Sequence, residues 1–111
     1  NCSDVLLSGG GISENGGQGI ELVSGNTEIV MNALSLKNNA SDGIKLTASS
    51  DNCYITTCRL KDNGGYGVNI AAASCDNNII LGNNASGNTS GQSQDLGTTT
   101  KIRSNIGIAD N

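Results

Sequence analysis

Much of the chain is a tandem repeat of about 24 residues. Gly19, Gly43 and Gly67 stand at one constant spacing, and each is followed by a short segment in which apolar residues alternate with polar ones. Other positions keep the same spacing, namely Asn15, Asn39 and Asn63, and further back Leu7, Met31 and Ile55. A repeat of this length is typical of a solenoid, in which each unit buries its apolar face against its neighbours.

Within each repeat the apolar residues fall at every second position, which is the spacing of a strand rather than of a helix. Asn, Gly, Ser and Asp fill the intervals, as expected for tight turns between short strands. The sequence therefore predicts coils over residues 1–25, 26–50 and 51–74, with about three strands in each. The expected strands are 5–8, 10–13 and 20–23 in the first coil, 29–32, 34–37 and 44–47 in the second, and 53–56, 58–61 and 68–71 in the third.

This coil length, together with a column formed by Asn15, Asn39 and Asn63, resembles the pectate-lyase-like β-helix superfamily, whose members stack asparagines at a turn. The resemblance implies an all-β fold: a single-stranded right-handed parallel β-helix of about four coils over residues 1–96. The fourth coil needs a register that is one residue longer than the repeat, which brings Asn88 into the asparagine column. Residues 87–94 of that coil are polar throughout, so we expect a loop or the end of the regular solenoid there.

The C-terminal segment, 97–111, contains one more strand-like stretch. Within it, Ile102-Arg-Ser-Asn-Ile-Gly resembles the stretch at which β-helices of phage tail proteins and related secreted glycosidase-like proteins pass into a C-terminal domain. We therefore expect a terminal strand that leads to a C-terminal domain absent from this chain. Because no initiator Met or signal segment stands at the start, we also expect the chain to be part of a longer protein.

The composition argues against several classes of function. Six Lys and Arg against ten Asp and Glu give a net charge of −4 without any basic block, so nucleic acid is not an expected partner. No apolar stretch is long enough to cross a membrane. His, Trp and Phe are absent, which removes the usual general base at neutral pH and most ring-stacking surfaces for sugars. We expect this segment alone not to be catalytic, although its parent protein could be a polysaccharide-degrading enzyme.

Four cysteines, Cys2, Cys53, Cys58 and Cys75, could form two disulfides with three pairings, and their spacing matches no zinc motif. The alternative is a core role. Cys53 falls in the inward column of Val5 and Ile29, and Cys58 in that of Leu34, so both are predicted to be small apolar side chains of the core.

Two outward columns carry acidic residues. Equivalent side chains on successive rungs lie about 4.8 Å apart, so Asp4 and Glu28 could form a carboxylate pair of the glycosidase kind. Asn52 and Asp76 are expected to extend that column, and a column with three acids could hold Ca²⁺. In the second column, Glu14, Asn38 and Asp62 lie beside lysines, which resembles the carboxylate and cation chemistry of β-helix lyases. The alternatives are local turn bonding for the first column and a solvated face of alternating charge for the second.

A third outward column is apolar: Leu6, Val30, Tyr54 and Ile79 should point outward if their neighbours point inward. An apolar stripe along one face of a solenoid is a candidate contact with another chain. Parallel β-helices of phage tailspikes and appendages stand side by side as trimers, so the resemblance implies a homotrimer. The alternatives are a covering loop, or a slip of one residue that would exchange the two faces.

Three functions are compatible with these patterns. The leading hypothesis is a rigid structural and host-glycan receptor-binding segment of an extracellular or virion-surface protein of the phage tailspike or appendage kind, which requires no cofactor. The second is part of a polysaccharide lyase, glycosidase or epimerase that acts on an acidic polysaccharide. The third is a repeat of a bacterial surface adhesin.

Overall fold

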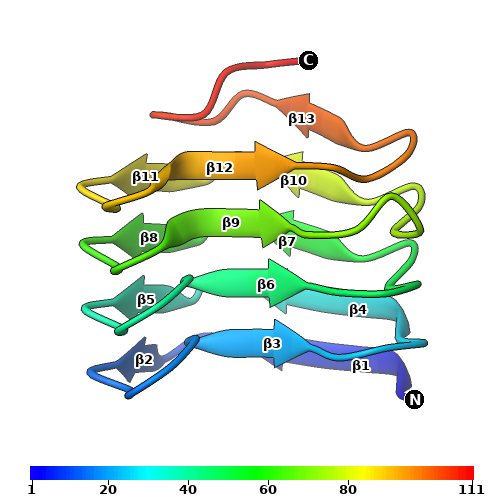
Figure 1. Cartoon of the computed structure of the whole chain (residues 1–111), viewed down its shortest axis with the longest axis horizontal. Coiled ribbons are helices and arrows are strands. Elements are labelled where there is room, and N and C mark those ends of the chain that lie inside the picture. Colours follow the sequence, from blue (N-terminus) through cyan, green and yellow to red (C-terminus); the bar gives the residue numbers. More distant parts are fainter.

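The computed structural model describes all residues, 1–111, and contains strands but no helix. The strands form three parallel sheets that wrap around a common core (Figure 1). Sheet 1 contains β1 (Ser3–Ser8), β4 (Thr27–Asn32), β7 (Tyr54–Thr56), β10 (Ile79–Leu81) and β13 (Lys101–Arg103). Sheet 2 contains β2 (Gly11–Ser13), β5 (Ser35–Lys37), β8 (Arg59–Lys61) and β11 (Asn84–Ser86). Sheet 3 contains β3 (Ile20–Leu22), β6 (Ile44–Leu46), β9 (Tyr66–Ile70) and β12 (Gly91–Asp95).

Each of the first four coils contributes one strand to each sheet, so residues one repeat apart lie on neighbouring rungs. Leu7 pairs with Met31, and Met31 pairs with Ile55. Ile55 then pairs with Ile80, so this step is one residue longer than the two before it, as predicted. The prediction of an all-β parallel solenoid with a period of about 24 is confirmed. The strand bounds agree with the predicted ones to within a few residues.

The core is a column of aliphatic side chains that runs along the solenoid axis. Seventeen apolar residues are buried, and Met31, Leu36, Ile55 and Leu60 have no exposed surface. Strand alternation explains the arrangement, because every second residue of each short strand points to the same side. The inward columns are therefore those expected from the sequence, including Leu34 and Cys58.

The polar segment of the fourth coil is the main difference from the prediction. The expected loop over 87–94 is wrong from Gly91 onward, because β12 pairs with β9 and continues sheet 3. Backbone groups form this pairing, so the strand does not require apolar side chains. Ser93 stands opposite Val68, and Asp95 opposite Ile70. The Asp95 carboxylate accepts hydrogen bonds from the Gly97 amide and the Thr100 hydroxyl, both at 3.0 Å.

Left-handed backbone conformations mark the turns of every coil. Asp4, Glu28 and Asn52 have φ between 52° and 57°, and Glu14, Asn38 and Asp62 have φ between 54° and 59°. Asn and Asp tolerate this region because their short side chains bond the local backbone, whereas glutamate is less common there. These two outward columns are thus corners of the solenoid.

Candidate functional site

The apolar column lies on the outer face of sheet 1. Leu6 pairs with Val30, Val30 with Tyr54, and Tyr54 with Ile79, so the four side chains form one continuous file, here called the apolar stripe. Leu6 is 65% exposed and Tyr54 41% exposed, whereas Val30 and Ile79 are half-buried. No loop covers Leu6 or Tyr54, and the inward neighbours of Val30 and Tyr54 are buried in the core, whereas Leu7 beside Leu6 is 37% exposed. The two alternatives, a covering loop and a slipped register, therefore do not describe this face.

The acidic residues of the first column lie at one corner of sheet 1. The pKa of Glu28 is raised above its ordinary value, first because its carboxyl shares a hydrogen bond with Asp4 and second because the two negative charges repel. Both side chains are exposed. The two carboxyls therefore interact at an exposed corner, and neither lines a hollow of the kind that would hold a sugar between a glycosidase pair.

Asp76 does not belong to this column, which corrects the sequence alignment. Its amide donates to the Asp51 carboxylate at 2.8 Å, and Asn52 instead lies below Asn77, which also has a positive φ. The reason is the longer step between the third and fourth coils, which moves every later residue by one place. The three-acid column that could hold Ca²⁺ is therefore not formed, and no group of three or more His, Cys, Asp or Glu side chains gathers in a metal-binding arrangement.

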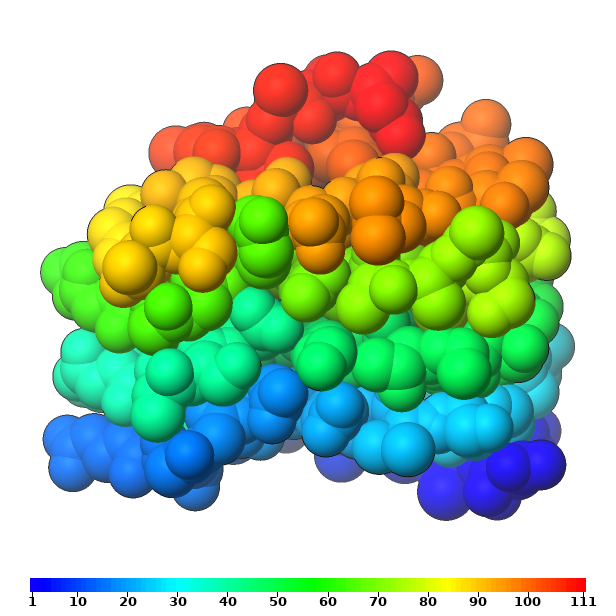
Figure 2. Space-filling view, in the orientation of Figure 1, coloured from blue at the N-terminus to red at the C-terminus, as the bar shows by residue number.

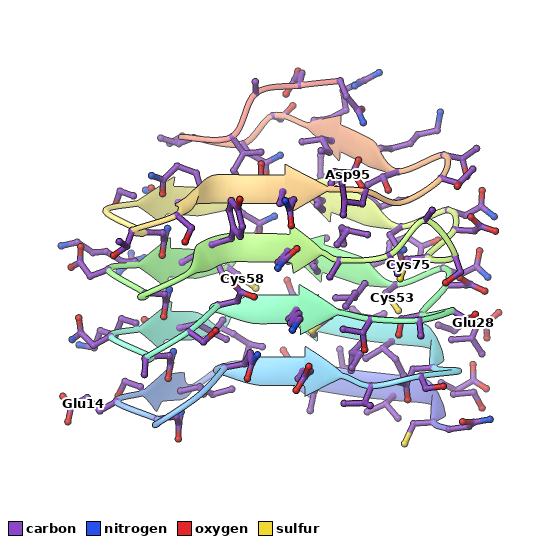
Figure 3. All side chains as sticks on the ribbon, in the orientation of Figure 1. Glu14, Glu28, Cys53, Cys58, Cys75 and Asp95 are labelled. Atoms are coloured by element: carbon purple, nitrogen blue, oxygen red, sulfur yellow. The ribbon has the colours of Figure 1, made fainter.

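The acidic residues of the second column lie at a different corner. Asp62 forms an exposed ion pair with Lys61 at 3.6 Å, and Glu14 is exposed at the tip of the first coil's turn. Glu14 and Glu28 lie at opposite edges of the solenoid (Figure 3), so the carboxylates of the two columns do not converge. None of Asp4, Glu14, Glu28 and Asp62 lines any of the three surface hollows.

The asparagine column is a hydrogen-bonded ladder inside the turn between sheets 2 and 3. Asn15 Nδ2 donates to Asn39 Oδ1 at 2.8 Å, and Asn39 Nδ2 donates to Asn63 Oδ1 at 2.9 Å. Asn63 Nδ2 donates to Asn88 Oδ1 at 2.9 Å. Asn88 then donates to Gln92 Oε1 at 2.7 Å, so a glutamine of the same coil ends the series. Asn39, Asn63 and Asn88 are buried, so these amides hold the turns together and are not accessible to a ligand.

A shorter amide ladder, which the sequence pattern did not reveal, lies at the turn between sheets 1 and 2. Asn83 Nδ2 donates to Asn105 Oδ1 at 3.0 Å and to the Ile55 carbonyl at 2.8 Å. Two features of the sequence conceal this ladder. Asn83 and Asn105 are closer together than one repeat, and the first three coils have Gly10, Leu34 and Cys58, not asparagine, at the equivalent position. Only the consecutive asparagines at 83 and 84 could have drawn attention to it.

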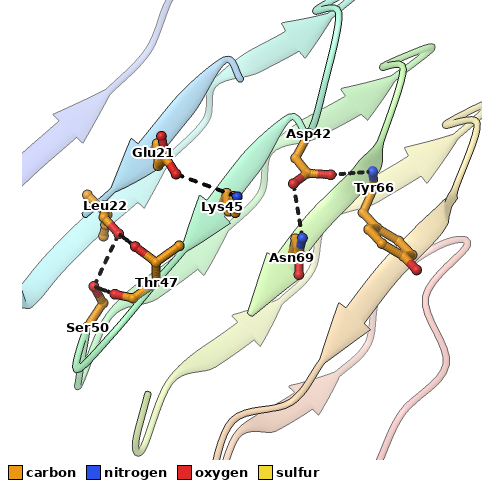
Figure 4. Close-up of polar contacts among 8 residues, drawn as sticks. All are labelled: Glu21, Leu22, Asp42, Lys45, Thr47, Ser50, Tyr66 and Asn69. Atoms are coloured by element: carbon orange, nitrogen blue, oxygen red, sulfur yellow. Dashed lines mark hydrogen bonds and ion pairs between the residues drawn. The ribbon is translucent and has the colours of Figure 1, made fainter. Parts of the chain in front are cut away.

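The outer face of sheet 3 carries a polar cluster that sequence reasoning also missed (Figure 4). Asp42 is buried, and its carboxylate accepts from the Tyr66 amide at 2.6 Å and from Asn69 Nδ2 at 3.0 Å. Asn69 Oδ1 is buried and has no hydrogen-bond partner. Lys45 pairs with Glu21 at 3.6 Å on the adjacent rungs. Together with Gln94, whose Nε2 lies 3.5 Å from the Tyr66 hydroxyl, these residues are called the polar face: Glu21, Asp42, Lys45, Tyr66, Asn69 and Gln94.

All four cysteines are free thiols in this structure. Cys53, Cys58 and Cys75 are buried in the core, whereas Cys2 is exposed. Burial raises the pKa of the Cys53 and Cys58 thiols, which keeps both protonated and unreactive at neutral pH. The core role predicted for these two cysteines therefore agrees with their packing, and Cys75 shares it.

Comparison with known proteins identifies the fold family. The family model described as "Right handed beta helix region" matches residues 1–106. Searches of curated proteins and of solved structures find no match. No helix is present that is long and apolar enough to span a membrane. The parallel strands, the stacked rungs of about 24 residues and this match over nearly the whole chain lead to one conclusion: the chain belongs to the right-handed β-helix family.

Proposed function

We propose that this chain is a rigid segment of an extracellular or virion-surface β-helix protein of the phage tailspike or appendage kind. In this role it stands side by side with two further copies and presents a surface to a cell-surface polysaccharide. The single observation that carries the proposal is the apolar stripe on sheet 1, which a solitary rod would leave in contact with water.

The geometry of the stripe favours contact with another rod. Its four side chains follow the solenoid axis at one per rung, so the stripe is straight and about 15 Å long. Leu81, which is 43% exposed on the same face, widens it at one end. A stable interface buries roughly 1,200–2,000 Å² in total, so the stripe would form the apolar centre and the flanking polar columns the rim.

Sedimentation equilibrium tests the association. We expect a trimer at micromolar concentration, and Tyr54→Glu should raise its dissociation constant at least about 100-fold, because a buried central anchor is replaced by a charge. Ser86→Glu adds the same charge on the exposed face of sheet 2 and should leave the trimer intact. A wild-type chain that remains a monomer at micromolar concentration, or a Tyr54→Glu variant that associates normally, would contradict the proposal.

The polar face supports the polysaccharide part of the proposal. Sugar hydroxyls need both donors and acceptors, and amide, carboxylate, ammonium and phenol groups lie next to one another on sheet 3. Tyr66 adds a partly exposed aromatic surface, whereas Asp42 and Asn69 are buried beneath it and hold it in place. This set fits a hydroxyl-rich glycan better than an apolar ligand.

A panel of neutral and acidic polysaccharides, measured by isothermal titration calorimetry, tests this surface. Lys45→Ala and Gln94→Ala should each weaken binding of any polysaccharide that the wild type binds by about tenfold, which corresponds to one polar contact of about 1.4 kcal/mol. Lys61→Ala removes a lysine from sheet 2 and should have no effect. Absence of binding across the panel, or equal losses in all three variants, would rule out the polar face.

A further inference from the structure

A hollow of about 340 Å³ lies at the corner between sheets 1 and 2, and it is lined by Ala33, Leu34, Ser35, Thr57 and Arg59. Ala33 and Ser35 belong to the second coil, and Thr57 and Arg59 belong to the third, where Arg59 pairs directly with Ser35. The small side chains of the lower rung leave the space below the larger side chains of the upper rung open.

The guanidinium group of Arg59 has no partner within the chain. Arg59 is exposed and takes part in neither of the two ion pairs. Its five N–H donors form a fixed fork that matches the geometry of a carboxylate. No acidic residue of this chain lines the hollow, so the carboxylate that Arg59 could bind has to come from another molecule.

The opposite corner of sheet 1 carries carboxylates without a cation. Asp4 and Glu28 lie there on neighbouring rungs, both are exposed, and neither forms an ion pair. Two like charges at this separation repel, and a cation that approaches from outside relieves the repulsion. The acidic corner, Asp4 and Glu28, is therefore complementary in charge to the hollow.

The acidic corner and the hollow flank the face that carries the apolar stripe. Asp4 and Gly9, which begin the two corners in the first coil, are five positions apart. At about 3.3 Å per residue the face is therefore about 16 Å wide. When three such faces surround an axis as a triangle, the middle of each lies about 5 Å from the axis, which is half the spacing of about 10 Å between packed sheets. Each vertex of the triangle then brings the acidic corner of one copy against the hollow of the next.

The heights of the two groups along the axis also match. The coils stack as successive bands along the axis (Figure 2), and Glu28 belongs to the same coil as Ser35. Equivalent atoms of a cyclic trimer lie at equal heights, so Glu28 of one copy would lie one rung, about 4.8 Å, below Arg59 of its neighbour. Antiparallel neighbours would instead place two acidic corners against each other.

These observations point to one occupant of the hollow. We propose that it receives the acidic corner of a second copy of this chain, with Arg59 paired to Glu28 of that copy. The proposal rests on the trimer proposed above, and it specifies which corners meet and that the copies are parallel. The pair would lie at the rim around the apolar stripe, where charges determine orientation and specificity more than affinity.

Charge reversal followed by sedimentation equilibrium tests this contact. Arg59→Glu places two carboxylates at each boundary and Glu28→Arg places two guanidinium groups there, so each should raise the dissociation constant of the trimer at least about tenfold. The double variant restores an opposite pair at every boundary and should return to within about threefold of the wild type. Lys37→Glu and Glu14→Arg make the same charge changes away from both corners and should each have less than about a twofold effect.

Each variant should keep the circular dichroism of the wild type, because all four side chains are exposed. If Arg59→Glu and Glu28→Arg weaken the trimer no more than the controls do, the contact is wrong and the proposed trimer stands. Two weakened single variants without recovery in the double variant would also refute the contact. A monomeric wild type would refute both the contact and the trimer. An Arg59 Nε–H signal that acetate shifts equally in the wild type and in Tyr54→Glu would assign the hollow to a small anion instead.

Discussion

Asn63 is the most deeply buried member of the asparagine ladder, so its replacement by alanine measures what the ladder contributes to stability. Its Oδ1 accepts from the Asn39 amide at 3.1 Å and from Asn39 Nδ2 at 2.9 Å. Its Nδ2 donates to the Leu36 carbonyl at 3.1 Å and to Asn88 Oδ1 at 2.9 Å. The side chain is fully buried, so water does not replace these bonds in the folded state.

The magnitude follows from those four bonds. A buried hydrogen bond contributes about 1 kcal/mol net, so Asn63→Ala should lower the free energy of unfolding by about 4 kcal/mol. The amide of Asn39 and the carbonyl of Leu36 lose a buried partner, which is the costly part of the change. Domains of this size have total stabilities of about 5–15 kcal/mol, so the variant should be folded only marginally.

Asn15→Ala is the matched control, because it makes the same chemical change in the same column. Asn15 is exposed and its side chain makes a single ladder bond, so the loss should be under about 1 kcal/mol. Urea unfolding followed by circular dichroism gives both values. Equal losses in the two variants, or a loss below about 1 kcal/mol for Asn63→Ala, would refute the stabilising role of the buried amides.

Three further outcomes are expected. Gly43→Ala should destabilise the fold by about 1–3 kcal/mol in urea unfolding, because the new Cβ would lie 2.7 Å from the glycine carbonyl oxygen one coil above, whereas Gly16→Ala has open space and should be neutral. Under native conditions a thiol reagent followed by mass spectrometry should label Cys2 only, and labelling of the three buried cysteines before unfolding would contradict their core role. The pKa of Glu28 is higher in the folded than in the unfolded state, so protonated Glu28 favours the folded state. This stabilisation is complete at pH values below the unfolded-state pKa and is lost as the pH rises through the folded-state pKa. A carboxyl NMR titration should show that Asp4→Asn lowers the Glu28 pKa, and an unchanged value would argue against contact between the two carboxyls.

Much of this protein is determined by its sequence alone. The constant period, the alternation around Met31 and Leu36 and the recurring asparagines suffice to predict a parallel solenoid, its inward columns and the outward position of Tyr54. These features are readable because each depends on a local rule: strand alternation fixes which side a residue faces, and the repeat fixes what lies above it.

Only the tertiary structure decided which polar residues meet. The contact of Asp42 with Asn69, the covering of the last rung by Asn111, and the displacement of Asp76 from the acidic column all depend on the exact step between coils. The strand at Gly91–Asp95 is the clearest case, because its side chains give no strand pattern and backbone groups make its pairing with β9. Rungs pair through backbone amides and carbonyls, which every residue has. Side-chain patterns therefore predict well which residues lie in the core, but they predict poorly which residues pair at the edges and meet at the corners.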